Sequence, residues 1–303
     1  MKALRLTLRQ LQIFVAVARA GSTTAAATEI SLSQSATSAA LNELESLLGG
    51  RLFNRAGRRL VLNENGRGML PQARWVLDAV QGIEAQFGGA GKLAPPQIRI
   101  AASTTTGNYL LPKVIAAWQK RERGARFTLD IGNTRDVVRS VVALDADVGF
   151  IEGPTTEPQV RLVPWTRDEL VVVASPRHPL ARGRRKVSLE SLRQATWLMR
   201  EPGSGTREVV EAALMPHLRR LRAEGEVASA EAMKEAVAEG AGLACLSRHA
   251  VADLVKLRRV VILSTALPPL PRELFLIHHE QRYFTPALQG FIDFALATYR
   301  RGR

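Results

Sequence analysis

Residues 11–66 read LQIFVAVARAGSTTAAATEISLSQSATSAALNELESLLGGRLFNRAGRRLVLNENG, and this stretch decides the fold of the first part of the chain. Just before it, Thr7 and Gln10 have the spacing of a capping box, which predicts that a helix begins after Thr7. Apolar residues then recur at helical spacing as far as Gly21, where glycine ends the helix because it accepts a left-handed conformation. The pattern predicts a first helix that packs on the elements that follow it.

Two further helices are predicted within the same stretch. Ser22 is the expected N-cap of a helix over residues 23–29. Ser33 is the expected N-cap of a further helix, which ends near residue 48, before two glycines. One face of this last helix is predicted to pack on the other two through Ala36, Thr37, Ala40, Leu41, Leu44 and Leu48.

The opposite face of the last helix carries small and amide side chains. Small residues let a helix approach the DNA major groove closely, and Gln34 and Asn42 can pair with an adenine edge. A solvated face would be the alternative, but such faces usually carry glutamate and lysine. We therefore interpret residues 11–66 as a DNA-reading head.

A basic segment follows this helix. Gly57 marks a turn, and residues 60–62 alternate as in a strand, so we expect a hairpin wing whose arginines follow the phosphate backbone. The residues expected to contact DNA are Thr23, Thr24, Ser33, Gln34, Ser35, Ser38, Asn42, Arg51, Arg55, Arg58 and Arg59.

The composition favours an anionic partner. The chain has 303 residues, which is too long for one compact core. Its formal net charge of +14 is typical of proteins that bind nucleic acid, and the alternative is a basic surface without function.

The single cysteine, Cys245, excludes an internal disulfide framework. It lies in an apolar run, which predicts a buried thiol in a reducing compartment. The first residues, MKALRLTLRQ, do not resemble a signal peptide, and no apolar stretch is long enough to span a membrane, so a cytoplasmic location is expected.

Sequence motifs of enzymes are missing. We find neither a Walker loop nor a Gly-x-Ser-x-Gly elbow, and the 5 histidines have no cysteine or acidic partners at metal-ligand spacing. The sequence therefore predicts a protein that is not an enzyme and has no cofactor and no metal site.

Residues 63–87 are predicted to form a long helix with one apolar seam. The seam has the 4-3 spacing of heptads, which favours pairing with a second copy of the chain, although an ordinary helix packed on its own domain is the alternative. Pro71 is expected to kink this helix or to remove one hydrogen bond. The seam consists of Met69, Ala73, Val76, Val80, Ile83 and Phe87.

From residue 97 onward, strand and helix patterns alternate, which predicts parallel sheets with covered faces in an α/β domain of two lobes. The glycine- and proline-rich residues 88–96 read as a hinge. The expected domains are a head at 1–66, a long helix and hinge at 67–92, and a two-lobed α/β domain at 93–303, with lobe I at about 97–167 and 268–303 and lobe II at about 168–267.

Polar loops follow several predicted strands. Ligands of open α/β sheets bind beyond the carboxyl ends of strands, where helix N-termini point. The loops at residues 103–107 and 201–207 and the corner at 133–134 offer hydroxyls and backbone N–H groups that favour a small anion, with Arg207 or Arg200 as the charged partner. The alternative is that these serines and threonines only cap helices.

The head resembles the winged helix-turn-helix of the LysR-type transcriptional regulators. The resemblance rests on Phe14, on Ala-Gly-Ser at 20–22, on Ala-Ala-Ala at 25–27, on Ser-Gln at 33–34, on Leu-Glu at 44–45 and on LGGRLFNR at 48–55. Ser35 and Ala39 depart from the family, which often has proline and arginine there. The wording ASTTTGNYLLP at 102–112, IEGP at 151–154 and REPGSGTR at 200–207 is similar to the branch that regulates sulfur assimilation and carbon-fixation operons.

The resemblance implies a linker helix for dimerisation and a periplasmic-binding-protein-like effector domain, whose ligands in this branch are small and often anionic. The predicted function is a DNA-binding transcription factor that regulates an operon in response to such a metabolite. The alternatives are a regulator without an effector and a solute-binding protein with an added head.

The expected partners are double-stranded DNA, a small anionic effector and RNA polymerase. Further copies of the chain are expected in a dimer or tetramer, and no membrane is expected as a partner. The expected ligand-binding residues are Ser103, Thr104, Thr105, Asn133, Thr134, Glu152, Gly203, Ser204, Thr206 and Arg207.

Overall fold

The computed structural model describes residues 5–57, 59–87, 97–183 and 185–300. The chain forms two compact units, of which the first comprises Met1–Ala94 with Gln281–Pro286 and the second Pro95–Glu280 with Ala287–Arg303. Each unit is described by itself.

The first unit begins with the helices that the capping residues predict. They are α1 (Leu8–Ala20), α2 (Thr23–Glu29) and α3 (Gln34–Leu48). The capping box of Thr7 and Gln10 is present, and Ser22 and Ser33 accept hydrogen bonds from backbone N–H groups of the first turns of α2 and α3. Gly21 and Gly49 are the left-handed C-caps of α1 and α3, with φ of 68° and 73°. The predicted starts and ends of these helices are therefore confirmed.

The core of the head lies between these helices and a wing. Phe14 is fully buried and its ring centroid lies 5.6 Å from that of Phe53 on the wing. On α3, the predicted apolar face is correct in its middle, where Thr37, Leu41 and Leu44 are buried. It is wrong at its ends, because Ala36 and Leu48 lie in the first and last turns and are exposed. The wing consists of β1 (Phe53–Ala56) and β2 (Arg59–Leu62), which pair in antiparallel fashion.

The linker helix α4 (Glu64–Phe87) begins close to the predicted start and includes Pro71. Leu70 and Ala73 are buried in the core of the head, with Met69 and Val76 packed partly against the same cluster. The first half of the predicted seam is therefore occupied within its own unit. Further along α4, Ile83 is 58% exposed and Val80 is half-buried, whereas the side chain of Phe87 lies outside the described residues.

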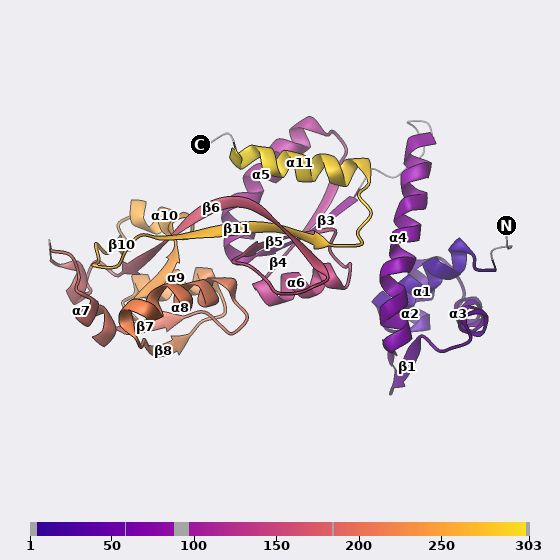
Figure 1. The fold of residues 1–303 in the computed structure, drawn as a ribbon, viewed down its shortest axis with the longest axis horizontal. Helices are drawn as coiled ribbons and strands as arrows, with labels where there is room; N and C mark the ends of the chain where they lie inside the picture. The colour runs from indigo at the N-terminus through magenta and orange to yellow at the C-terminus, as the bar shows by residue number, and fades with distance from the viewer. Residues whose placement is uncertain (1–4, 58, 88–96, 184, 301–303) are drawn as a thin grey trace. The chain divides into compact units, whose positions relative to one another are not determined.

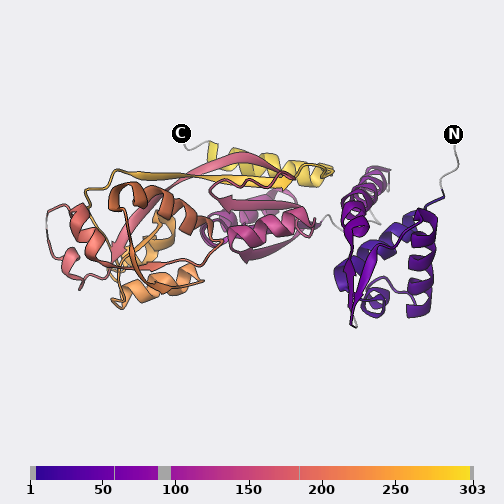
Figure 2. The same cartoon turned by 60° about the horizontal axis from the view of Figure 1, so that its bottom comes forward.

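The second unit is organised on a mixed sheet. Strands β3 (Gln97–Ser103), β4 (Arg126–Gly132) and β5 (Val148–Glu152) are parallel, in the order β5-β3-β4. The long strands β6 (Val160–Ala174) and β11 (Leu270–His279) are antiparallel to each other, and β11 is antiparallel to β5. The expectation of parallel sheets alone is therefore wrong, because the chain passes between the lobes in opposite directions on β6 and β11 (Figure 2).

Lobe I packs helices on both faces of this sheet. A π-helical turn (Thr106–Leu110) leads into α5 (Leu111–Arg121), which lies with α11 (Pro286–Arg300) on one face, while α6 (Thr134–Val142) lies on the other (Figure 1). Aromatic rings fill the space under α5 and α11, with the centroids of Phe150 and Trp165 4.6 Å apart and those of Trp118 and Phe291 5.8 Å apart.

Lobe II has a core of its own around the fully buried Trp197. The elements of lobe II are η2 (Pro179–Ala181), α7 (Leu189–Gln194), β7 (Thr196–Met199), α8 (Gly205–Leu218), β8 (Arg222–Glu226), α9 (Ala230–Ala238), β9 (Ala244–Ser247), α10 (Arg248–Lys256) and β10 (Val261–Ile262). In this lobe β9 pairs with β6, and β7 pairs in parallel with β8. The sequence pattern predicts strands at residues 197–199 and 243–246 and helices at about 207–215 and 230–239, which correspond to β7, β9, α8 and α9, but it does not predict α7, β8, α10 or β10.

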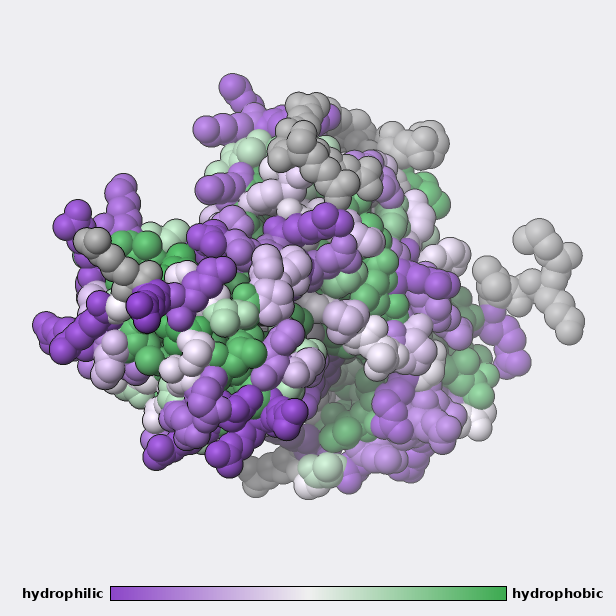
Figure 3. Space-filling model, turned by 60° about the vertical axis from the view of Figure 1, so that its left-hand side comes forward, coloured by the Kyte–Doolittle hydropathy of each residue, from purple (hydrophilic) through white to green (hydrophobic). Residues whose placement is uncertain are grey.

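The surface is mainly polar on the face that Figure 3 shows, with smaller apolar areas between the hydrophilic side chains. Within the described residues, no helix has the length and hydrophobicity needed to cross a membrane.

Candidate functional site

The predicted DNA-reading face of α3 is exposed. Gln34, Ser35 and Asn42 are exposed and Ser38 is half-buried. The side chain of Gln34 donates a hydrogen bond from Nε2 to Thr23 Oγ1 at 3.2 Å, which ties the start of α3 to the start of α2. Ser33, in contrast, uses its hydroxyl to accept from the N–H of Ala36 at 3.1 Å and therefore acts as a cap.

The wing presents the predicted arginines to solvent. Arg51, Arg55 and Arg59 are exposed, and Asn63 Nδ2 donates to the carbonyl of Arg51 at 2.8 Å, which fixes the entry to the wing. Arg58 lies outside the described residues. The guanidinium groups thus lie on the segment that follows α3 in sequence. Phosphate contacts beside a helix that reads the DNA groove need positive charges at such a position.

A buried polar cluster lies where the two lobes of the second unit meet. Glu152, at the end of β5, accepts hydrogen bonds from the N–H of Thr105 at 2.7 Å, from Arg272 Nη1 at 3.2 Å and from the hydroxyl of Thr206 on α8. Burial alone would raise the pKa of Glu152, but the charge of Arg272 and the hydrogen bonds of Thr206 and Thr105 hold this pKa below its ordinary value. Glu152 is therefore an ionised group that joins lobe I to lobe II.

Arg272 is the centre of this cluster. Its guanidinium donates to Asp168 Oδ2 at 2.8 Å, to Thr206 Oγ1 at 3.0 Å and to Thr105 Oγ1 at 3.2 Å. Asp168 also accepts from the hydroxyl of Ser247 at 3.0 Å. The sequence reasoning missed both Arg272 and Asp168, although a charged residue at an inward-facing position of an apolar strand is a usable signal.

Two helix N-termini meet at the same place. Asn133 caps α6 by accepting from the N–H of Asp136 at 3.0 Å, and Ser204 caps α8. A Cβ on Gly205 would lie 2.0 Å from the carbonyl oxygen of Glu152 and 2.4 Å from Thr134 Oγ1, so only glycine allows this approach. Thr134 Oγ1 is buried and has no hydrogen-bond partner in the described part of the chain.

The two arginines that the sequence suggested as anion ligands are bonded to carboxylates. Arg207 Nε lies 2.9 Å from Glu211 Oε1 and its Nη1 lies 2.9 Å from Glu226 Oε2, and the hydrogen bond to Glu211 contributes most to raising its pKa. Arg200 binds Glu201 through Nε and Nη2 at 2.9 and 3.0 Å and donates to Thr104 Oγ1 at 3.0 Å. The structure therefore pairs the guanidinium of Arg207 with carboxylates of lobe II and not with the hydroxyls of the buried cluster.

Further contacts join the lobes around this cluster. The N–H of Arg135 on α6 donates to the carbonyl of Gly203 at 3.1 Å. On α9, Glu231 accepts from the hydroxyl of Tyr109, and Lys234 Nζ donates to the same hydroxyl at 3.2 Å. Most predicted ligand residues thus lie at one boundary between the lobes, where Thr105 and Thr206 bond to Glu152.

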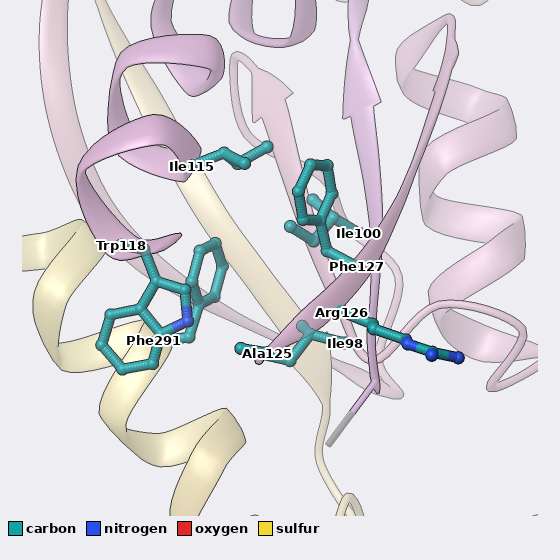
Figure 4. Close-up of a pocket in the computed structure, with 8 residues that line it drawn as sticks. All are labelled: Ile98, Ile100, Ile115, Trp118, Ala125, Arg126, Phe127 and Phe291. Atoms are coloured by element: carbon teal, nitrogen blue, oxygen red, sulfur yellow. The ribbon is translucent and has the colours of Figure 1, made fainter. Parts of the chain in front are cut away.

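The apolar cavity in Figure 4 is a different feature. It has a volume of about 10 Å³, enough for at most one water molecule, and lies within lobe I between β3, β4, α5 and α11. Its lining includes Ile98, Ile100, Ile115, Trp118, Phe127 and Phe291, while Arg126 directs its guanidinium away from them. Neither its size nor its chemistry suits a metabolite. Among the described residues, no group of His, Cys, Asp and Glu side chains could hold a metal ion.

A helix-turn-helix head with a wing, followed by a long helix and a two-lobed α/β domain, defines a ligand-responsive transcription regulator. Family models agree: residues 8–67 match the bacterial regulatory helix-turn-helix protein of the lysR family, and residues 92–300 match the LysR substrate binding domain. The chain belongs to the LysR family of transcriptional regulators. It therefore acts as a regulator and not as an enzyme.

Individual relatives extend over nearly the whole chain. An uncharacterized HTH-type transcriptional regulator, YeiE of Escherichia coli, is 44% identical over 294 residues, which are 96% of this chain and 97% of YeiE. The RuBisCO operon transcriptional regulator of Allochromatium vinosum is 33% identical over 298 residues, 98% of each chain. This second relative confirms the predicted resemblance to regulators of carbon-fixation operons.

Solved structures show the same fold. A full-length OxyR variant from Pseudomonas aeruginosa superposes with a TM-score of 0.79 at 22% identity and covers 98% of this chain and 96% of that chain. The regulatory domain of Synechocystis CcmR in complex with 2-PG gives a TM-score of 0.63 at 26% identity and covers 68% of this chain and 99% of that domain.

Proposed function

We propose that this regulator binds a small anionic metabolite between the two lobes of its effector domain. The observation that carries the proposal is the meeting of α6 and α8 at their N-termini, with Thr134 Oγ1 against Gly205. Helix N-termini carry partial positive charge, which favours an anion. The unbonded hydroxyl of Thr134 is a donor that such a ligand would satisfy.

The relatives support this class of ligand. The structure of the CcmR regulatory domain is that of a complex with 2-PG, and its fold matches the fold of this effector domain. By analogy, a small ligand would enter at the boundary between the lobes, where Thr104, Asn133 and Ser204 also lie.

We infer that ligand binding acts by shifting the population of lobe arrangements. The bonds of Glu152 to Thr206 and of Arg200 to Thr104 join the lobes without a ligand, so a ligand would compete with or add to them. A change in lobe arrangement would alter the spacing of paired heads on an operator. Pairing would use the part of α4 that the core of the head leaves open, at Val80 and Ile83.

A thermal-shift experiment on the full-length protein tests this function. Inorganic phosphate, sulfate and acetate are compared with chloride at the same ionic strength, in the wild type, in Thr134→Val and in the control Thr128→Val, which changes a threonine of β4 that lies outside the boundary between the lobes. We expect at least one oxyanion to raise the melting temperature of the wild type and the control, and to raise that of Thr134→Val less.

If no oxyanion raises the melting temperature of the wild type above its value in chloride, the anionic ligand is contradicted and a regulator without an effector is favoured. An equal rise in Thr134→Val and the wild type would place the anion elsewhere.

A further inference from the structure

A short segment after the last strand of the sheet packs on the linker helix. Residues 281–286 follow β11 and lead into α11, and they have no regular structure before Pro286. Although β11 and the rest of α11 belong to the second unit, residues 281–286 group with the first unit, which contains α4. We call residues 281–286 the strap.

Two contacts hold the strap against α4. Arg282 Nη1 lies 3.1 Å from Asp78 Oδ2, and the two side chains are only 6% and 18% exposed, so this ion pair is largely shielded from water. One turn later on α4, Gly82 is buried, and a Cβ at this position would lie 3.1 Å from Tyr283 Oη and 3.2 Å from Tyr283 Cε1. The tyrosine ring therefore occupies the space that a side chain at position 82 would need. This packing explains a glycine in the interior of a helix, where glycine is otherwise unfavourable.

The strap and the apolar seam use different faces of α4. Asp78 and Gly82 are four residues apart, so they lie on the same side of the helix. Val80 lies between them in sequence and points in nearly the opposite direction, because successive residues of a helix are rotated by about 100°. The strap therefore leaves the seam at Val80 open, and both faces of α4 can be occupied at the same time.

We propose that the strap is a clamp that passes movements of the effector domain to the linker helix. The strap continues directly into α11 and follows β11, the strand that also carries Arg272 of the buried cluster between the lobes. A shift of β11 or α11 therefore moves a segment that an ion pair and a packed tyrosine fasten to α4. The head moves with α4, because Leu70 and Ala73 of this helix are buried in the core of the head. The clamp needs no particular ligand, so this inference goes beyond the proposed function.

Hydrogen–deuterium exchange of the full-length protein, measured by mass spectrometry, tests the clamp through its ion pair. We expect Arg282→Gln, a change in the strap, to speed amide exchange in residues 78–87 of α4 at least about tenfold. Asp78→Asn, a change in α4, should speed exchange in residues 283–293 to a similar extent, because coupling between two segments acts in both directions.

Two further variants control this test. Arg161→Gln should leave both segments within about twofold of the wild type, because Arg161 pairs with Glu280, next to the strap, but its side chain is 69% exposed. The double variant Asp78→Arg with Arg282→Asp restores an ion pair of reversed sign and should bring exchange in both segments back towards the wild type.

Gly82→Ala tests the second contact without changing a charge. Alanine favours a helix more than glycine does, so a purely local effect would slow exchange in α4 and leave the strap unchanged. We expect exchange in residues 283–293 to become faster instead, because the new methyl group displaces Tyr283. Gly68→Ala is the matched control on the same helix, since a Cβ at Gly68 meets nothing within 4 Å.

The clamp is overturned if each substitution changes exchange only in the segment that carries it, because α4 and the strap would then be independent. It is also overturned if Arg282→Gln changes exchange in α4 no more than Arg161→Gln does. Failure of the charge-reversed pair to restore slow exchange, together with an unchanged strap in Gly82→Ala, would contradict both contacts.

Discussion

Arg272 and Asp168 lie opposite each other on β11 and β6, and their side chains form an ion pair with Nη2 and Oδ2 2.7 Å apart. Glu152 lies 3.2 Å from the same guanidinium, and all three side chains are at most 1% exposed. One buried cation therefore balances two buried carboxylates. Loss of one partner from such a cluster is costly because the remaining charge is left uncompensated.

This predicts that Arg272→Met lowers the free energy of unfolding by about 3–5 kcal/mol. Urea denaturation of the purified protein at neutral pH measures the effect. Arg248→Met is the control, since Arg248 pairs with Glu169 at 2.7 Å but is 52% exposed. Its expected cost is about 0–1 kcal/mol. Equal costs for the two variants would show that the buried cluster is not held together by Arg272.

Glu152 predicts a specific dependence on pH. The pKa of Glu152 in the folded state lies below its ordinary value of 4.5, because Arg272, Thr206 and Thr105 outweigh the effect of burial. The stability that ionised Glu152 contributes is thus fully present above pH 4.5 and is lost as the pH falls through the lower, folded-state pKa. Urea denaturation between neutral and acid pH should show the difference between wild type and Glu152→Gln shrinking on the acid side. A difference that grows there would contradict the lowered pKa.

The head could be predicted closely because its signals are local. The capping box at Thr7 and the caps at Ser22 and Ser33 each involve residues a few positions apart, so the sequence alone places them. The same holds for Thr105, which follows β3, and for Thr206, which lies in the first turn of α8.

The charged centre of the buried cluster between the lobes could not be predicted in this way. Arg272 and Asp168 meet only because β11 and β6 pair in one register, and they are 104 residues apart in sequence. The hydrophobic pattern within each strand does not show which residues of two distant strands lie opposite each other. Arg207 looked like an anion ligand in sequence, whereas in the structure it binds Glu211, four residues later on α8, and Glu226 on β8.

Burial also decides the chemistry of Cys245, as its apolar surroundings in the sequence predicted. The thiol is buried near Asp168 and Arg272, and burial raises its pKa to about 12. It therefore remains a thiol at neutral pH and is a structural residue of β9, because the reactive form of cysteine is the thiolate.

The head predicts two different effects on DNA binding. We expect Arg55 to contact a DNA phosphate, so Arg55→Ala should weaken binding to specific and unrelated DNA alike and lower the salt slope by about 1. We expect Gln34 to contact a base, so Gln34→Ala should mainly reduce discrimination between DNA sequences, by about 1–3 kcal/mol. Gel shifts with the DNA upstream of the coding sequence and with an unrelated duplex, at several salt concentrations, measure both. Arg177→Ala, an exposed arginine of the effector domain, is the control. If Arg55→Ala behaves like this control, the wing does not contact the phosphates.

The exposed part of α4 predicts that the chain works in pairs. Ile83 is 58% exposed on a helix whose earlier apolar positions, Leu70 and Ala73, are already buried in the head. An apolar side chain this exposed on a long helix is best covered by a second copy of the same helix. Ile83→Asp should therefore weaken self-association of the full-length chain at least about tenfold, because it would bury an unpaired charge at the seam. Sedimentation velocity over a range of concentrations measures this, with Gln81→Asp, also exposed on α4, as the charge-matched control. If Ile83→Asp self-associates as strongly as the wild type, the contact between copies lies outside this part of α4. A monomeric wild type would rule out pairing altogether.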